Sequence, residues 1–356
     1  MIHNGLDDIV VAETVLSDVD GVAGRLTIRG FALDELAGRA SFEQVLHLLF
    51  GGFFADLPSA DQLAARLGAA RAEVFAALAP ILPELARRPV YDGMRAGLAL
   101  LPDGSGLDDA LRLIAAPGVL TPALLHLQAG KEVPLPPAPA LGHAEDIARM
   151  LGSTQGAGAL DTYLVTVCDH GLNASTFAAR VVASTQAGLG SSVLAGLGAL
   201  KGSLHGGAPG PVIAMLDAIA DHGDARVWLE QAVHGGERLM GFGHRIYRTR
   251  DPRADALKGA LSALPRSAGR LAFAEQVEAT ALAVLAAHKP GRVLQTNVEF
   301  YTALLLEAVG FPPDAFTAVF AMGRVGGWIA HAREQAQTGR LIRPKSVYLA
   351  PQPQAA

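Results

Sequence analysis

Residues 241–253, which read Gly-Phe-Gly-His-Arg-Ile-Tyr-Arg-Thr-Arg-Asp-Pro-Arg, place a titratable ring beside several cations. Glycines on both sides of Phe242 expose His244 at a turn. Asp251 and Pro252 are residue types that start a helix, as the N-cap and the first helical position. Arg253 then falls in the first helical turn, where free backbone N–H groups and the helix dipole favour anions. The segment predicts an anion site that contains a proton donor.

Two further segments offer groups for acid–base chemistry. Residues 201–209 are rich in glycine and expose His205 ahead of an expected helix. A neutral imidazole beside a helix N-terminus can donate a hydrogen bond to a carbonyl oxygen that gains negative charge. In residues 296–301, Asn297 can cap a helix and Glu299 lies in its first turn. Taken alone, Glu299 is more simply interpreted as an ordinary carboxylate favoured by the helix dipole.

Two more places hold polar residues in unusual surroundings. Residues 169–176 are densely polar within an apolar region and include His170. Arg324 has small neighbours that let its side chain reach inward, and Arg343 precedes Pro-Lys-Ser. A single arginine at either position would by default be a surface charge.

Composition narrows the class of protein. The chain has 356 residues, of which 50% are hydrophobic and 6% aromatic, and its formal net charge of −5 predicts no nucleic-acid or anionic-lipid partner. The single cysteine, Cys168, excludes an intramolecular disulfide and, with an N-terminus too polar for a signal peptide, predicts a cytoplasmic protein. Residues 181–200 are uncharged but contain polar residues and glycines in mid-run. They predict two buried helices broken near 188–190, and no membrane span.

The periodicity predicts an all-α, mainly helical fold with a small N-terminal β-hairpin. The β-rich stretches 9–16 and 25–29 flank the turn dipeptide Asp20-Gly21. Prolines between 134 and 139 predict a stiff surface connector. Apolar spacing and capping signals predict helices near 41–49, 60–79, 107–116, 121–128, 143–151, 158–169, 174–188, 192–200, 211–221, 225–239, 252–263, 272–288, 298–309 and 315–337.

Other chemistries lack their sequence patterns. The remaining histidines show no His/Cys/Asp/Glu spacing typical of a metal site. The Gly-rich piece at 188–190 follows a helix and not a strand, which argues against a dinucleotide fingerprint. No nucleophile elbow or P-loop occurs. Cys168 is interpreted as a small buried hydrophobe and not as a nucleophile.

In combination, these motifs resemble a known family. Residues 241–253 look like the signature of citrate synthases, and residues 173–180, 202–208 and 343–346 resemble other segments of that family in the same order. The resemblance runs from about residue 5, through residues 11–14, to residue 345. It therefore covers nearly the whole chain.

The resemblance implies a two-domain homodimer. The large domain would comprise 1–206 and 309–356, and a small domain, 207–308, would close over the substrates. His205 would lie at the hinge, and Arg343 would reach the active site of the partner subunit. The implied partners are small-molecule substrates, with no nucleic acid and no membrane.

The resemblance also implies the reaction, in which acetyl-CoA condenses with oxaloacetate and water to give citrate and CoA. Glu299 would remove a methyl proton, His205 would bind the enolate oxygen, and His244 would polarise the oxaloacetate carbonyl. His170, Arg253, Arg324 and Arg343 would hold the oxaloacetate carboxylates, since guanidinium groups match carboxylates in shape. Arg248, Arg250 and Lys258 would meet the CoA phosphates. The family uses acyl-CoA as a co-substrate, and we expect no metal and no permanently bound cofactor.

Two residues depart from the family pattern. Glu299 stands where the family normally has aspartate, and Gly171 stands where a glutamate commonly follows the histidine. A misplacement of about 1 Å can cost on the order of 10²-fold in rate, so the longer stem of Glu299 must be accommodated. Two alternatives therefore stay open, a 2-methylcitrate synthase that uses propionyl-CoA and a non-catalytic homologue that binds acyl-CoA or a dicarboxylate.

Overall fold

A computed structural model describes residues 4–6, 9–132, 134–206, 210–244, 246–264, 267–291 and 294–349. Gly207 to Pro209 of the second glycine-rich segment, Arg245 of the signature segment and the polar residues at the start of the chain lie outside the described residues. The fold is mainly helical with one small sheet, which confirms the predicted fold class.

The sheet is a three-stranded antiparallel meander formed by β1 (Ser17–Asp20), β2 (Arg25–Ile28) and β3 (Phe31–Ala32). The Asp20 carboxylate accepts hydrogen bonds from the backbone N–H groups of Val22 (3.0 Å) and Ala23 (2.8 Å), which fixes the turn. Asp20 pairs with Arg25 and Ser17 with Ile28. The hairpin is present, but the prediction of a first strand at 9–16 is wrong, because this register makes 17–20 the partner of β2.

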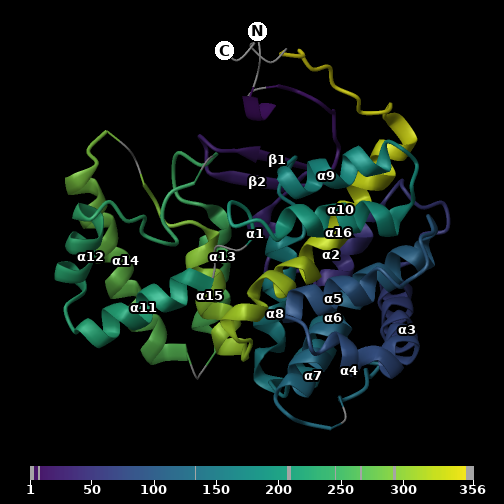
Figure 1. The fold of residues 1–356 in the computed structure, drawn as a ribbon, viewed down its shortest axis with the longest axis horizontal. Helices are drawn as coiled ribbons and strands as arrows, with labels where there is room; N and C mark the ends of the chain where they lie inside the picture. The colour runs from purple at the N-terminus through teal and green to yellow at the C-terminus, as the bar shows by residue number, and fades with distance from the viewer. Residues whose placement is uncertain are drawn as a thin grey trace, which may run out of the picture.

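The sheet is followed by helices throughout the described chain (Figure 1). They are α1 (Leu33–Leu36), α2 (Phe42–Phe50), α3 (Ala60–Leu78), α4 (Leu82–Leu85), α5 (Val90–Leu98), α6 (Leu107–Gln128), α7 (His143–Leu151), α8 (Ala157–Val167), α9 (Ala174–Ala183), α10 (Leu189–Leu200), α11 (Gly210–His222), α12 (Ala225–His234), α13 (Pro252–Ser262), α14 (Ala268–His288), α15 (Val298–Val309) and α16 (Phe316–Thr338). Short 3-10 turns lie at Asn4–Leu6, Ala79–Ile81, Thr154–Gly156 and Pro313–Ala315.

Several helix boundaries differ from the prediction. The expected helices 107–116 and 121–128 form one continuous α6, which contains Pro117 and Pro122 in its buried interior. α9 ends at Ala183 and α12 at His234, each about one turn before its predicted end, and α5 was not predicted. The break predicted near 188–190 is present between α9 and α10.

α8 is the central helix of the fold. It packs against α13, α15 and α16, which are far apart in sequence. In Figure 1, α11, α12 and α14 lie on one side of these helices, and α3 to α7 lie on the other. Helices α11 to α15 fall in the range predicted for the small domain, and that division of the chain stays a prediction. Among the described residues, α6 alone is a single helix long and apolar enough to cross a membrane, and most of its apolar window is buried within the fold.

Candidate active site

The fold gathers the predicted site residues from five places in the sequence. His170 follows α8, His205 follows α10, and His244 lies in the loop between α12 and α13. Arg253 and Glu299 lie in the first turns of α13 and α15, and Arg324 lies inside α16. The rings of His170 and His244 are 5.8 Å apart, and burial first, then the charges of Arg253 and Arg324, lower the pKa of His170. These residues therefore form one cluster.

The backbone fixes the tautomer of His244. Its Nδ1 accepts hydrogen bonds from the backbone N–H groups of Ile246 and Tyr247, both at 3.0 Å. Burial first, and then the nearby Arg253 charge, lower the pKa of His244 to about 4. A neutral ring whose Nδ1 accepts must carry its hydrogen on Nε2. His244 therefore presents a neutral N–H donor.

Arg253 is held by its own helix cap. Asp251 caps α13 and receives two side-chain hydrogen bonds from Arg253, one from Nε (3.0 Å) and one from Nη2 (2.8 Å). The Nη2 atom also lies 3.3 Å from His244 Nε2. Since both nitrogens carry hydrogens, two donors face each other, and an oxygen acceptor from a ligand can satisfy both. This is the strongest geometric sign of a substrate position.

His170, which follows α8, lies beside the same region. Its Nε2 lies 3.1 Å from the Tyr247 hydroxyl. Burial is the largest cause that lowers its pKa, so the ring is neutral near pH 7. The preceding residue, Asp169, is buried and lies 3.2 Å from His331 Nε2, while Gly171 N donates to Ser17 Oγ (2.8 Å). The loop that carries His170 is therefore fixed on both sides.

His205 is oriented by a buried hydroxyl. Its Nε2 lies 2.8 Å from Ser175 Oγ, which also accepts a hydrogen bond from Trp328 Nε1 (3.2 Å). Burial first, and then Arg324, lower the pKa of His205 to about 4. The single hydrogen of the Ser175 hydroxyl has a second acceptor, Asn173 Oδ1, at 2.8 Å. When that hydrogen points to His205 Nε2 instead, the hydrogen of the neutral imidazole lies on Nδ1. His205 can then donate from Nδ1 to a ligand oxygen.

Arg324 is a buried cation without a carboxylate partner among the described residues. Its side chain is 1% exposed, and its Nε donates to the backbone carbonyl of Val167 (2.6 Å). Burial lowers its pKa to about 10, with Asp169 opposing that effect and Arg253 adding to it. Two neighbouring buried guanidinium groups, Arg253 and Arg324, favour an anionic ligand.

Glu299 supplies the carboxylate of the cluster. Asn297 caps α15 and accepts from Glu299 N (3.1 Å), which places Glu299 in the first turn as predicted. The residue is half-buried, but its Oε2 is fully buried and has no hydrogen-bond partner among the described residues. Burial is the largest cause that raises its pKa, and Arg253 opposes it. A carboxyl group in such surroundings suits general base chemistry near neutral pH.

The remaining predicted site residues lie apart from this cluster. Arg343 is exposed in residues 339–349, which extend beyond α16 without helix or strand. Arg248 is exposed, and its backbone N–H donates to the Gly21 carbonyl in the β1–β2 turn (2.8 Å). Arg250 already pairs with Asp255 (2.5 Å) and Glu278 (2.9 Å). Lys258 pairs with Glu275 at 2.8 Å. Of the three residues predicted to meet CoA, Arg248 alone has no carboxylate partner in the described part of the chain.

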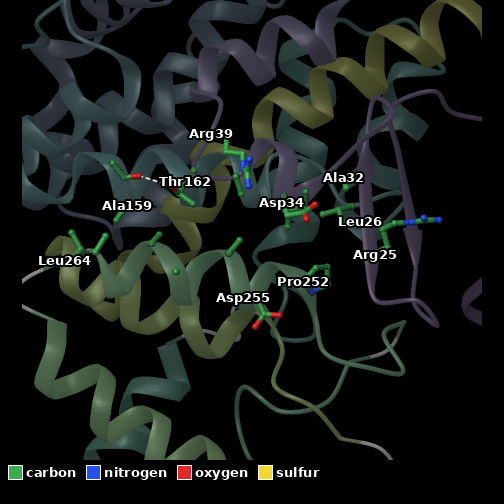
Figure 2. Close-up of a pocket in the computed structure, with 18 of the residues that line it drawn as sticks. Arg25, Leu26, Ala32, Asp34, Arg39, Ala159, Thr162, Pro252, Asp255 and Leu264 are labelled. Atoms are coloured by element: carbon green, nitrogen blue, oxygen red, sulfur yellow. Dashed lines mark hydrogen bonds between the residues drawn. The ribbon is translucent and has the colours of Figure 1, made fainter.

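A further hollow of the described structure is separate from the cluster. It is a cleft of about 1040 Å³ between the β2–β3–α1 region and helices α8 and α13. Figure 2 shows Asp34 and Arg39 on one side and Asp255 and Leu264 on the other. None of the predicted catalytic or oxaloacetate-binding residues lines it.

Sequence reasoning missed several supporting residues. Tyr247 lies inside the signature segment, and Ser175 lies in the polar segment 169–176, so both were near a detected signal. Trp328 follows Arg324 by four residues, a spacing that puts both on one helix face. Within the described ranges, no group of three or more His, Cys, Asp or Glu residues is placed to hold a metal ion.

Comparison with known proteins gives consistent results. The family model for the citrate synthase C-terminal domain matches residues 5–345. A putative citrate synthase 2 of Mycobacterium tuberculosis H37Rv is 36% identical over 365 aligned residues, covering 99% of this chain and 94% of the relative. A 2-methylcitrate synthase of the same strain is 35% identical over 367 residues, covering 98% and 90%.

A solved structure shares the fold over the whole chain. It is the ternary complex of carboxymethyl coenzyme A and oxaloacetate with citrate synthase from Thermoplasma acidophilum. The TM-score is 0.85 at 27% sequence identity, and the match covers 100% of this chain and 98% of that one.

Proposed function

The chain belongs to the citrate synthase family, and from this membership we propose that it condenses acetyl-CoA with oxaloacetate and water to give citrate and CoA. The observation that carries the proposal is the pair of donors formed by His244 Nε2 and Arg253 Nη2, which are 3.3 Å apart and share no acceptor in the chain as described. A ketone oxygen with an adjacent carboxylate is a ligand of the right kind for that position.

The first step forms the nucleophile. The Glu299 carboxylate removes a proton from the methyl group of acetyl-CoA, and the electron pair of that C–H bond becomes the enolate double bond. His205 Nδ1–H donates to the thioester oxygen, which gains the negative charge. The depressed pKa of His205 supports this role. It keeps the ring neutral near pH 7, and a neutral imidazole can donate its one N–H to an oxygen that gains charge.

The second step forms the carbon–carbon bond. The enolate carbon attacks the ketone carbon of oxaloacetate, and the carbonyl electron pair moves to the oxygen. His244 Nε2–H donates to that oxygen as its charge develops. Arg253 and Arg324 hold the substrate carboxylates, with His170 as a further neutral donor. The neutral histidines leave the two arginines as the cations that select a dianion.

The third step releases the products. The citryl-CoA alkoxide takes up a proton, which balances the one that Glu299 removed. Water then adds to the thioester carbonyl and loses a proton, the C–S bond breaks, and the thiolate takes up a proton and leaves as CoA. A site closed to bulk water protects the enolate until the carbon–carbon bond has formed. We propose that the small domain, 207–308, closes over the site and that Arg343 completes the site of a partner subunit in a homodimer. The exposure of Arg343 within a single chain supports that role.

Arg248 is our candidate for the CoA phosphates, because it is exposed and lies four residues after His244. Arg250 and Lys258 are proposed as secondary contributors, which would have to share their charge with the acidic residues that already bind them. A cytoplasmic location remains a prediction from the single cysteine.

A second candidate function is supported by the Glu299 departure and by the 2-methylcitrate synthase among the relatives. In this alternative the acyl donor is propionyl-CoA, and Glu299 removes a proton from the methylene carbon beside the thioester. The Glu299 side chain is one methylene longer than that of aspartate, so its carboxylate can lie at a different distance from the acyl carbon. That difference is compatible with a larger acyl group.

Thiol release measured with acetyl-CoA and with propionyl-CoA, each with oxaloacetate, tests both candidates. Preference for acetyl-CoA in kcat/KM supports the citrate synthase, and preference for propionyl-CoA supports the alternative. Release with neither substrate, by protein shown calorimetrically to bind oxaloacetate, would leave the non-catalytic homologue. As a control, Arg39→Ala removes a cation of the separate cleft and should leave both rates unchanged.

A further inference from the structure

One buried polar group beside the cluster has no place in the mechanism above. Tyr163 lies on α8 and is 0% exposed, and its hydroxyl has no hydrogen-bond partner among the described residues. α8 packs against the three helices that carry Arg253, Glu299 and Arg324. Val167, one turn after Tyr163 on the same helix, holds Arg324 through its carbonyl. The ring is therefore set among the charged groups of the site.

The charges that act on Tyr163 identify its surroundings. Burial is the largest cause that raises the pKa of its hydroxyl; Arg324 and Arg253 oppose that effect, and Glu299 adds to it. These are the two cations and the carboxylate of the proposed mechanism. A neutral hydroxyl in this position can donate one hydrogen bond.

Glu299 offers the complementary atom. Its Oε2 is buried and equally lacks a partner. An unpaired donor and an unpaired acceptor therefore share one buried neighbourhood. Glutamate has one more side-chain torsion than aspartate, so the Glu299 carboxylate can be turned toward a donor that the shorter residue would not reach.

A buried unpaired hydroxyl costs stability, whereas phenylalanine would fill the same space without that cost. Tyr91 on α5 shows the ordinary solution, since its buried hydroxyl donates to the Leu197 carbonyl (2.6 Å). An unpaired buried hydroxyl beside a catalytic cluster fits a group that is used in the liganded state.

We propose that Tyr163 is a positioning residue whose hydroxyl donates to the Glu299 carboxylate when substrate binds, and so aligns the longer base. This inference rests on the proposed role of Glu299 as the base. No covalent step is added. The hydrogen bond orients the carboxylate and favours its ionised form before proton abstraction.

Other charged groups around Glu299 are already placed. Asp251 and Arg253 face it from the start of α13, and Arg238 acts on it from the loop after α12. Asp217 of α11 is engaged with Arg270, which also binds Glu307 at the far end of α15. Tyr163 is thus the neutral donor on the α8 side.

The test compares Tyr163→Phe with Tyr91→Phe, which removes a paired buried hydroxyl on α5, a helix that carries none of the proposed site residues. Without ligand, Tyr163→Phe should raise the melting temperature and Tyr91→Phe should lower it. A melting temperature lowered by Tyr163→Phe would show that the hydroxyl already has a partner, and would overturn the proposal.

The second readout is the titration of the Glu299 carboxyl. Infrared difference spectra against Glu299→Gln, recorded with oxaloacetate bound, report this group without any turnover. Loss of a donor to a carboxylate should move the midpoint upward by about one to two pH units in Tyr163→Phe. The acid limb of the kcat profile should move by the same amount, and kcat at neutral pH should fall about tenfold. Tyr91→Phe should move neither.

The outcomes separate this proposal from the proposed function. An inactive wild type whose Glu299 midpoint still responds to Tyr163→Phe would reject the reaction but keep the contact. An active enzyme with an unmoved midpoint would reject the contact. A raised KM for oxaloacetate with an unmoved acid limb would mean that the hydroxyl binds substrate, which also overturns it. In a Glu299→Asp background, the Tyr163→Phe shift should disappear, because the shorter carboxylate withdraws from the hydroxyl.

Discussion

Two consecutive residues, Asp169 and His170, belong to two buried polar clusters of opposite character. Asp169 belongs to a paired cluster that also contains Arg180, His331 and Glu334. Arg180 Nη1 donates to Glu334 Oε2 (2.5 Å) and lies 2.9 Å from His331 Nδ1, while His331 Nε2 faces Asp169 at 3.2 Å. His331 Nε2 is equally close to both Asp169 oxygens, and Ser17 Oγ donates to Oδ2 of that carboxylate (2.7 Å). Each of these charged groups has a hydrogen-bond partner within the protein.

His170 belongs to the catalytic cluster, in which that balance is missing. Arg324 has no carboxylate partner in the described chain, Glu299 Oε2 and the Tyr163 hydroxyl have no hydrogen-bond partner there, and two donors meet between His244 and Arg253. The contrast teaches that the charged groups of the paired cluster stabilise the fold, whereas those of the catalytic cluster lack partners that a bound substrate can supply. Buried charges that stabilise a fold are paired within the protein, whereas buried charges that bind a ligand have no such partner until the ligand is bound.

The largest effect is expected from removing the base of the catalytic cluster. Glu299→Gln keeps the size of the side chain but cannot accept the methyl proton. Turnover in the thiol-release assay should fall on the order of 10³-fold, within the range of general base catalysis. Calorimetric binding of oxaloacetate should persist, because the arginines remain. Activity within tenfold of wild type would show that another group takes the proton.

The paired cluster should respond in stability instead. Arg180→Met leaves Glu334 as a buried carboxylate without its cation and should lower the free energy of unfolding by about 3–5 kcal/mol. The matched change in the catalytic cluster, Arg324→Met, removes a cation that has no carboxylate partner among the described residues. It should change stability by only about 1 kcal/mol yet weaken oxaloacetate binding roughly 10-fold to 100-fold. Urea unfolding and calorimetry measure the two effects, and equal stability losses would erase the distinction between the clusters.

Local signals in the sequence predicted much of this fold. The capping box at Ser41 gave the start of α2, and Asp251 with Pro252 gave the start of α13. The predicted break between 116 and 121 does not occur, because burial of nearly every surrounding residue keeps α6 continuous through Pro117 and Pro122. α5 was missed because Gly93 and Gly97 weaken its pattern. In the fold these glycines allow close contact with Leu85, Leu120 and Leu124.

The residues of the candidate site likewise divide into those that local sequence patterns predict and those that helix packing brings to the site. Residues in glycine turns and at helix starts, such as His244, Arg253 and Glu299, were found from local patterns. The supporting groups were not. Ser175 and Tyr163 reach the site only because α8, α9 and α10 all pack against α16, and no spacing within one segment encodes that packing.

The pH dependence of stability offers a third, smaller contrast. The folded-state pKa values of His205 and His244 are about 4, below the usual value near 6.5. Between these values the unfolded chain binds more protons than the native one. Stability should therefore fall as pH drops from about 6.5 to about 4, by at most about 1.4 kcal/mol per pH unit for each ring.

Denaturant unfolding across this window, for wild type and for His205→Gln/His244→Gln, isolates the contribution. The variant should show the shallower slope. Glu299 acts in the opposite direction, since its raised pKa means that the native state gains protons first. An identical slope in the two proteins would mean that the histidines are not held neutral by the catalytic cluster.

The smallest effect on stability and binding is expected at Gly171, which follows Asp169 of the paired cluster and His170 of the catalytic cluster. Gly171 follows His170 with a left-handed φ of +61°, and an added Cβ would meet only Val19 at an ordinary 3.4 Å. Gly171→Ala should therefore cost about 1 kcal/mol through backbone strain, without a clash. In contrast, Gly198→Ala in α10, where an added Cβ meets nothing within 4 Å, should be stabilising by up to about 1 kcal/mol. If relief of that strain shifts His170, the KM for oxaloacetate will rise in Gly171→Ala alone. If the KM is unchanged, the paired cluster holds Asp169 firmly enough to fix His170 by itself.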